Sequence, residues 1–182
     1  MIALVGCGKA KLDHPAPARE LYTGNLFKAA FAYCEARYTQ VLIISAYHGL
    51  LHPDAIIAPY DTAMTDLSND QRVQWGRRVA YRLFYPYIIR YEGHVLGTYP
   101  NVEIHAGELY VKYLMPPLLE RRILAQVPCR GLQIGERLAF YKAAQIAHKD
   151  DERSRLRFMS TDQGRSDVDL DVIHTDEAPE ES

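Results

Sequence analysis

The sequence is poor in the residues that build disulfide frameworks and zinc sites. It has 3 cysteines among 182 residues, and Cys7, Cys34 and Cys129 lie far apart in the chain. Without closely spaced pairs, neither a disulfide framework nor a set of zinc ligands is predicted. Free thiols are typical of a reducing compartment, so we expect a cytoplasmic protein.

Long apolar runs and targeting signals are missing as well. No stretch reaches the roughly 18 consecutive apolar residues that favour a transmembrane helix, so we expect no membrane association. The chain enters an expected strand at Ile2 without a basic lead or a small-residue cleavage site, so no secretory signal is predicted.

The common cofactor and hydrolase motifs are absent. The segment Gly6–Lys9 matches neither the P-loop pattern nor the longer glycine pattern of dinucleotide-binding proteins. A nucleophile elbow, H-E-x-x-H and C-x-x-C do not occur either. ATP, NAD, serine-hydrolase and zinc chemistry are therefore disfavoured, and we expect no cofactor and no metal.

The net charge of −2 conceals two segments of opposite sign. Residues 150–182 hold eleven acidic and four basic residues, whereas the preceding residues are basic overall. A mildly basic body suits a phosphate-bearing ligand or nucleic acid, and an acidic end of this kind is expected to be disordered. We therefore expect one domain at residues 1–149 and an acidic, disordered tail at 150–182.

Short apolar strands alternate with amphipathic helices along the expected domain. Strands are expected at residues 2–5, 41–44, 95–97 and 102–105. Helices are expected at residues 26–37, 69–91, 108–115, 118–126 and 135–149, with loops at 10–24 and 45–61. Asn25 is expected to cap the first helix, and Ser68 or Asn69 is expected to cap the second. Pro86 is expected to end or kink the second helix, and Pro116 and Pro117 are expected to stop the third. The alternation predicts a three-layer α/β/α domain with a small, mostly parallel central sheet.

The ends of three expected strands carry the polar residues that indicate a site. In open α/β sheets, ligands bind beyond the carboxyl ends of the strands, and Ser45–Asp54 directly follows the second strand. Candidate catalytic residues are Ser45, His48, Asp54, Asp61 and Glu108. Candidate ligand-binding residues are Cys7, Gly8, Lys9, Lys11, Tyr22, Tyr47, Tyr60, Gly107 and Tyr110.

Each kind of candidate has a chemical reason. Lys9 and Lys11 carry point charges suited to a phosphate, while Gly8 and Gly107 let backbone N–H groups approach a ligand closely. The helix after Gly107 adds the positive end of its dipole. The tyrosines are suited to stacking on a base. An aspartate can orient a hydrolytic water or stabilise an oxocarbenium ion, and His48 can transfer a proton near neutral pH.

Structural interpretations of the same residues stay open. Lys11 is equally explained as a solvated loop residue, and His48 as a histidine bonded to a loop carbonyl. Asp54 also fits a turn, Asp61 a helix or turn cap, and Glu108 the acidic first turn that stabilises many helices.

Six motifs occur in the order found in a known family. They are Cys7–Lys11, Ala16–Phe27, Ser45–Asp54, Pro59–Asp61, Ala106–Tyr110 and Ile134–Glu136. Together they resemble the domain of unknown function 6884, a bacterial and phage family, over about residues 2–145. That family commonly has Lys where this chain has Tyr47, so a charge at this position is not essential here.

A looser resemblance connects the chain to proteins that handle modified bases. Cys7, Lys9 or Lys11, Tyr22 and Tyr60–Asp61 are similar in order to motifs in the C-terminal α/β domain of archaeosine tRNA-ribosyltransferase-type proteins. The expected fold is also similar to the uracil-DNA-glycosylase type. These resemblances imply a link to modified bases in nucleotides or nucleic acid.

One main hypothesis and two alternatives follow. The main hypothesis is a metal-independent enzyme that acts on a nucleobase, nucleotide or nucleic acid (DNA or tRNA), at an N-glycosidic bond. The first alternative is a non-catalytic module that binds nucleic acid or a nucleotide signal, in stress response or phage defence. The second is an accessory protein of such a system that works through protein contacts. A perturbed acid or histidine in a closed pocket favours the enzyme, an open basic groove the binding module, and an exposed apolar patch the accessory protein. The sequence does not define an oligomeric state.

Overall fold

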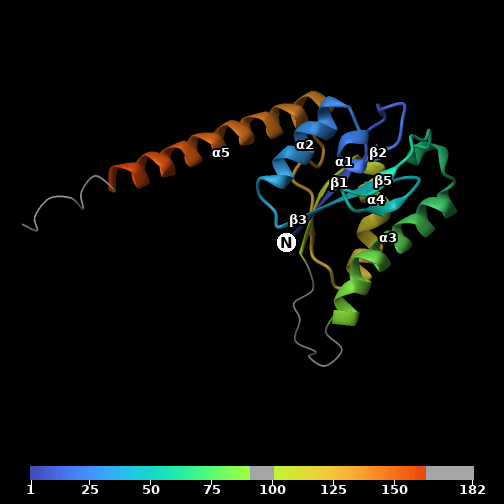
Figure 1. Cartoon of the computed structure of the whole chain (residues 1–182). Helices are drawn as coiled ribbons and strands as arrows, with labels where there is room; N and C mark the ends of the chain where they lie inside the picture. Colours follow the sequence, from blue (N-terminus) through green and yellow to red (C-terminus); the bar gives the residue numbers. More distant parts are fainter. Residues whose placement is uncertain (91–100, 163–182) are drawn as a thin grey trace, which may run out of the picture. The chain divides into compact units, whose positions relative to one another are not determined.

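A computed structural model describes residues 1–90 and 101–162 of the chain (Figure 1). The strand expected at 95–97 and the last part of the expected tail lie outside these residues. The chain divides into two compact units, Met1–Ala144 and Gln145–Ser182. The described part of the second unit is the continuation of helix α5 (Ile134–Asp162), so residues 150–162 of the expected tail are helical.

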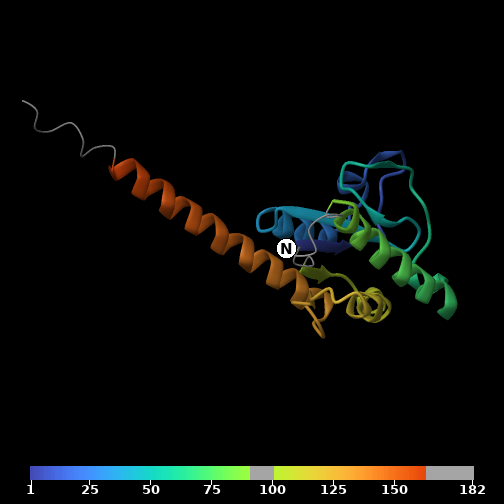
Figure 2. The same ribbon diagram turned by 90° about the horizontal axis from the view of Figure 1, so that it is seen from below.

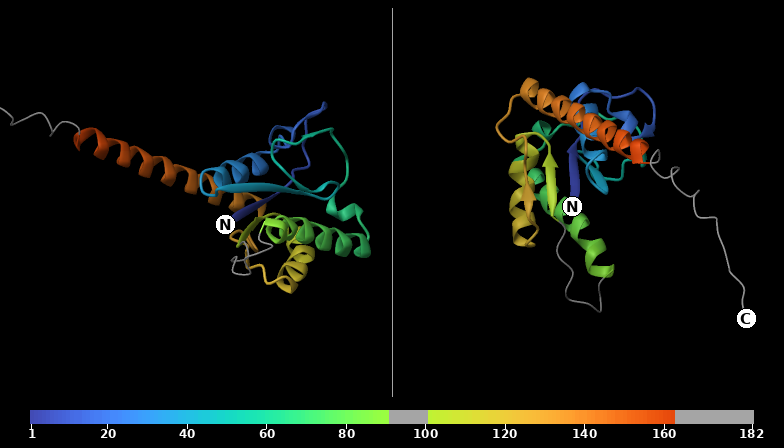
Figure 3. Two further views of the ribbon diagram at one scale, coloured as in Figure 1. Left: turned by 60° about the horizontal axis from the view of Figure 1, so that its bottom comes forward. Right: turned by 90° about the vertical axis from the view of Figure 1, so that its left-hand side faces the viewer.

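A five-stranded sheet forms the centre of the first unit. Its strands are β1 (Ile2–Gly6), β3 (Gln40–Ser45), β4 (Gly49–Leu51), β6 (Val102–His105) and β7 (Ala125–Gln126). Their order is β4-β3-β1-β6-β7, and β4 alone among these five runs antiparallel to its neighbour. Figure 3 shows β1 and β6 side by side at the centre of the sheet. The expected strands at 2–5, 41–44 and 102–105 are thereby confirmed.

Helices cover both faces of this sheet. The main ones are α2 (Asn25–Glu35), α3 (Asn69–Arg90) and α4 (Glu108–Glu120). Ile2 and Leu4 of β1 pack into the core that includes α3 and α4, while Ala3 and Val5 pack into the core that includes α2. Figures 1 and 2 show α2 across the sheet from α3 and α4. The expected three-layer α/β fold with a mostly parallel sheet is confirmed.

Both segments expected as loops contain short regular elements. The first holds β2 (Ala16–Pro17) and α1 (Ala18–Leu21), and the second holds β4 and β5 (Ile56–Ile57). Strands β2 and β5 pair with each other in a separate antiparallel ribbon. Two-residue strands carry no periodicity, so the sequence pattern could not predict them.

The cap of α2 differs from the expectation, while the cap and bounds of α3 agree with it. Helix α2 begins at Asn25 with Gly24 in the N-cap position, so Asn25 is not the cap. Ser68 does cap α3, because its Oγ accepts a bond from the Gln71 N–H at 3.3 Å while the Gln71 side chain accepts one from the Ser68 N–H at 2.7 Å. This is a capping box. Helix α3 does not end at Pro86 but continues to Arg90.

Helix α4 continues through two prolines that were expected to stop it. It contains Pro116 and Pro117 and ends at Glu120, so the helix expected at 118–126 is absent and β7 follows instead. Pro117 has no N–H for the Tyr113 carbonyl four residues earlier. Gly76 of α3 packs against that carbonyl oxygen, which would lie 2.0 Å from a Cβ at position 76. The missing side chain at Gly76 therefore lets α3 and α4 pack closely.

Candidate functional site

A cavity of about 700 Å³ lies at the carboxyl ends of β1 and β6. Three segments form its wall: residues after β1, the segment before α3, and the start of α4. This is the edge of the sheet at which ligands bind in open α/β folds. Eight residues predicted from the sequence line it, namely Cys7, Gly8, Lys9, Lys11, Asp61, Gly107, Glu108 and Tyr110.

The two lysines of this wall are held differently. Lys11 is half-buried, its Nζ donates to the Lys9 carbonyl at 3.2 Å, and the same atom lies 4.4 Å from the centre of the Tyr60 ring. A cation at this distance is attracted to the face of an aromatic ring. The Lys9 side chain is exposed and forms no ion pair or hydrogen bond with any residue that the structure describes. Lys9 is therefore the cation available to a ligand.

Three carboxylates also line the cavity, and two of them take part in local hydrogen bonds. Asp66 accepts a bond from the Ala63 N–H at 2.7 Å, and Glu108 accepts one from the Gly131 N–H at 3.3 Å. Asp61 is exposed, and within residues 1–90 and 101–162 its carboxylate has neither a hydrogen bond nor an ion pair. Asp61 is therefore the acid that is free to act on a ligand.

Tyr110 is fixed at the inner wall of the cavity. Its hydroxyl lies 3.2 Å from the Cys7 Sγ, and its ring meets Trp75 edge to face with the centroids 5.3 Å apart. The Trp75 Nε1 in turn donates to the Ser45 carbonyl at 2.7 Å. Burial raises the pKa of Tyr110, so its phenol stays protonated near neutral pH and can donate a hydrogen bond.

A chain of hydroxyl groups lies beside the cavity and positions Tyr60. The Tyr60 hydroxyl lies 2.8 Å from that of Tyr22 and 2.7 Å from the Ser45 Oγ. The Ser45 Oγ also accepts bonds from the N–H groups of Tyr47 at 3.2 Å and His48 at 3.1 Å. Ser45 and Tyr22 are fully buried, and burial raises the pKa of Tyr22 to about 12. They hold Tyr60 in place and do not line the cavity.

His48 and Asp54, both predicted to be catalytic, also lie outside the cavity wall. The His48 ring packs edge to face against Tyr60 at 5.0 Å between centroids, and burial lowers the pKa of His48. Its buried Nε2 has no hydrogen-bond partner among the described residues. Asp54 pairs with Arg19 at 2.8 Å, beside a different hollow of about 360 Å³ that also includes the start of β3. The structure thus separates these two side chains from Asp61.

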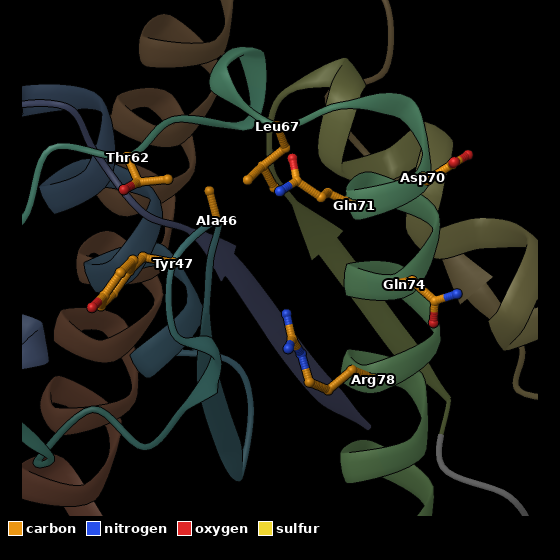
Figure 4. A pocket seen from close by; sticks show the side chains of 8 residues that line it. All are labelled: Ala46, Tyr47, Thr62, Leu67, Asp70, Gln71, Gln74 and Arg78. Atoms are coloured by element: carbon orange, nitrogen blue, oxygen red, sulfur yellow. The ribbon is translucent and has the colours of Figure 1, made fainter.

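A second cavity of about 410 Å³ adjoins the first and shares Thr62 with it. Figure 4 shows its wall, which consists of Ala46, Tyr47, Thr62, Leu67, Asp70, Gln71, Gln74 and Arg78. Tyr47 is 60% exposed and stacks on Tyr60, with the centroids 5.2 Å apart and the rings inclined by 21°. The stacked rings fix each other in position. Tyr47 lines the second cavity, and Tyr60 lies beside the first.

Sequence reasoning missed Leu109 and the segment Thr62–Asp66, which also line the cavity. Arg72 of α3 holds this segment, donating to the carbonyls of Met64 at 2.7 Å and Thr65 at 2.9 Å. The capping box of α3 was a usable signal, because it places the preceding residues at the entry of a helix that packs on the sheet.

A separate polar cluster is buried on the face of the sheet covered by α2. His105 Nε2 lies 3.0 Å from the Glu103 Oε1, and its Nδ1 lies 3.1 Å from the Tyr141 hydroxyl. Burial lowers the pKa of His105 to about 4, so this histidine is neutral near pH 7. It is the last residue of β6 but does not line the cavity.

Metal ligands and membrane-spanning helices are the remaining features of interest among the described residues. No group of three or more His, Cys, Asp or Glu side chains within residues 1–90 and 101–162 is placed to hold a metal ion together. In the same part of the chain, no helix is both long enough and apolar enough to cross a bilayer.

The sequence was matched to a known protein family. The model of a protein family described as a family of unknown function, DUF6884, matches residues 2–143, which confirms the resemblance carried by the six motifs. No curated protein matches the sequence.

Proposed function

The chain belongs to the DUF6884 family, and we propose that it is an enzyme acting on a nucleobase, nucleotide or nucleic acid at an N-glycosidic bond. The observation that carries this proposal is that one cavity holds both a carboxylate, Asp61, and an ammonium group, Lys9. Neither group has a hydrogen bond or an ion pair with a described residue. The cavity of about 700 Å³ also lies within the range of roughly 300–1,000 Å³ typical of small-ligand sites.

The phosphate of the ligand binds at the positive side of this cavity. Lys9 supplies a point charge. Gly107 occupies the N-cap position of α4, a helix of 13 residues, and the unpaired N–H groups of a helix N-terminus favour an anion. The Glu108 carboxylate accepts a bond from the Gly131 N–H, so one of its oxygens is engaged in a local contact. These groups orient the ligand without taking part in bond cleavage.

The base and sugar then occupy the inner part of the cavity. Tyr110, fixed by Cys7 and Trp75, offers the base a rigid ring and a protonated hydroxyl. When the C–N bond breaks, its electron pair leaves with the base and positive charge develops on the sugar. Asp61 stabilises that charge and accepts a proton from the water whose oxygen adds to the sugar carbon. This proton then passes to the departed base, so that Asp61 returns to the carboxylate and the products are the free base and the sugar hydroxyl. Such chemistry needs no metal.

The residues beside the cavity act on Tyr60 and not on the substrate. Ser45 and Tyr22 bond its hydroxyl, and His48 packs against its ring. Tyr60 in turn holds Lys11 above its face. We assign these residues to positioning, in place of the roles in acid–base chemistry and ligand contact that the sequence suggested for them.

The looser sequence resemblances support a substrate that contains a base. Similarity of motif order to archaeosine tRNA-ribosyltransferase-type proteins, and of fold to the uracil-DNA-glycosylase type, favours tRNA or DNA as the source of that base. A bacterial or phage origin and a cytoplasmic location fit the same assignment.

Base release from labelled nucleotides, tRNA and DNA containing modified bases tests the proposal. Asp61→Asn is expected to reduce kcat by roughly 10²–10⁴-fold, the usual effect of losing acid–base assistance, with little change in affinity. Lys9→Ala is expected to weaken binding and to flatten its salt dependence, because a phosphate contact releases counterions. Asp54→Asn is the matched control, since Asp54 lies outside the cavity.

Two outcomes separate the enzyme from the binding module. Full activity of Asp61→Asn contradicts the catalytic role of this residue. Binding by the wild-type protein without base release from any substrate identifies a non-catalytic binding module instead, for which the exposed Lys9 and the neighbouring second cavity would be the ligand contacts.

A further inference from the structure

The second cavity continues the proposed active site in one direction. It shares Thr62 with the main cavity and lies between the segment after β3 and helix α3. The proposed reaction uses only the main cavity. A ligand that extends past Thr62 would therefore enter a second space of about 410 Å³, which the proposed reaction does not need.

One side of the second cavity is an exposed aromatic ring held in a fixed position. Tyr47 packs one face against Tyr60 at 5.2 Å between centroids, and its side is also met by the His48 ring at 4.8 Å. It nevertheless remains 60% exposed. A ring that is fixed on one face and open on the other is suited to stacking on a base, a contact that tolerates any base identity.

The opposite side of the second cavity carries an unpaired positive charge. Figure 4 shows Arg78 of α3 reaching into the space that faces Tyr47, while Asp70 at the start of the helix points away. Arg78 is exposed and forms no ion pair with a residue in the described ranges. The Gln71 side chain also points into this space, whereas that of Gln74 points away (Figure 4). The Gln71 Oε1 accepts a bond from the Ser68 N–H, so its amide NH₂ is the group that can donate to a ligand. Such an arginine matches the charge and geometry of a phosphate group.

We propose that the second cavity is a subsite for the nucleotide next to the reacting one, so that the substrate is a single-stranded polynucleotide. This inference rests on the proposed function of the main cavity. Tyr47 stacks on the neighbouring base, and Arg78 binds a neighbouring phosphate. A duplex would have to release its target base from the stack before the strand could lie in this way.

Binding of a fluorescent pentanucleotide, as DNA and as RNA, is compared with that of the four 5′-mononucleotides. The wild-type protein is expected to bind one or both pentanucleotides more tightly, and the two strands distinguish DNA from RNA. Tyr47→Ala should reduce the ratio of pentanucleotide to mononucleotide affinity by about 5- to 150-fold, the effect of losing one stacked base. Tyr47→Phe, which keeps the ring, should preserve the ratio.

Arg78→Gln tests the charge, with Arg77→Gln as its matched control. Both arginines are exposed on α3, but Arg77 does not line either cavity. Arg78→Gln should lower the slope of log affinity against log salt by about 0.7, the value for one phosphate contact with a single strand. Arg77→Gln should leave the slope as in the wild-type protein.

The two proposals fail separately. Equal affinity for mononucleotide and pentanucleotide, or equal effects of the two arginine variants, overturns the subsite even if base release is observed. Length-dependent binding that requires Tyr47 and Arg78, without base release from any substrate, upholds the subsite and overturns the catalytic proposal. No binding of any pentanucleotide to the wild-type protein overturns the subsite directly.

Discussion

Replacing Ser45 by alanine tests how the buried hydroxyl chain holds Tyr60. The Ser45 Oγ lies 2.7 Å from the Tyr60 hydroxyl and accepts the N–H groups of Tyr47 and His48. Ser45 is 0% exposed, so water cannot easily replace these bonds. Leaving a buried polar group unsatisfied costs about 1–3 kcal/mol, and we expect Ser45→Ala to destabilise the fold by this amount.

Tyr60→Phe removes the same contact from the other side. It leaves the Ser45 Oγ with its two N–H donors but takes a partner from Tyr22. Residues in one hydrogen-bond network couple by about 0.5–3 kcal/mol. The double variant should therefore lose less stability than the sum of the two single variants.

Urea unfolding followed by circular dichroism measures these free energies, provided that the m-value stays constant. A second cycle, Ser68→Ala with Tyr60→Phe, is the control. Ser68 is an exposed N-cap of α3 whose loss costs typically about 1 kcal/mol, and it shares no partner with Tyr60. Additivity within about 0.5 kcal/mol in both cycles would refute the hydroxyl chain as a coupled unit.

Three further variants test other parts of the account. Gly76→Ala would place a Cβ 2.0 Å from the Tyr113 carbonyl oxygen, so we expect it to lower the free energy of unfolding by about 1–3 kcal/mol or more through overpacking. Gly24→Ala, whose Cβ meets nothing within 4 Å, is the control. Equal urea midpoints for the two variants would contradict the close packing of α3 on α4. Burial lowers the pKa of His105 from 6.5 to about 4, so between these pH values the unfolded chain binds a proton that the folded chain does not bind. Stability should therefore fall as the pH drops from about 6.5 towards 4. Urea unfolding at several pH values should show a flatter profile of stability against pH for His105→Gln, and an unchanged profile would contradict the buried neutral histidine. Asp54→Asn breaks an exposed pair worth less than about 1 kcal/mol and should keep full base release; a loss as large as that of the Asp61 variant would contradict the placement of the active site.

The sheet was predictable because its central strand β1 is apolar along its whole length and β3 carries the apolar run Val41–Ile44. Residues of β1 are buried on both faces, which produces the continuous apolar run seen in the sequence. The place of the cavity followed from the rule that ligands bind beyond the carboxyl ends of such strands. Cys7, Lys9 and Asp61 could therefore be assigned to one edge of the sheet from the chain alone.

Which candidate side chains line the cavity and which pack beside it could not be predicted, because this depends on contacts between residues far apart in the sequence. Ser45 and His48 stand in the same motif as Tyr47, but one hydroxyl turns inwards to Tyr60 while the Tyr47 ring remains exposed. Asp54 lies apart from the cavity because Arg19, far away in sequence, binds it beside another hollow, and this contact left no pattern in the sequence. Helix α4 continues through Pro116 and Pro117 because its tertiary packing against α3 outweighs the low helix propensity of proline.

A crystal structure of the protein with a bound nucleoside 5′-monophosphate is the most direct test of the central claim. We predict that the phosphate lies within hydrogen-bond distance of the Lys9 Nζ and the first turn of α4. The base should lie against Tyr110, and the Asp61 carboxylate should face the carbon that carries the base. A nucleotide bound in the hollow beside Arg19 and Asp54, or one in the main cavity whose sugar is turned away from Asp61, would contradict the account.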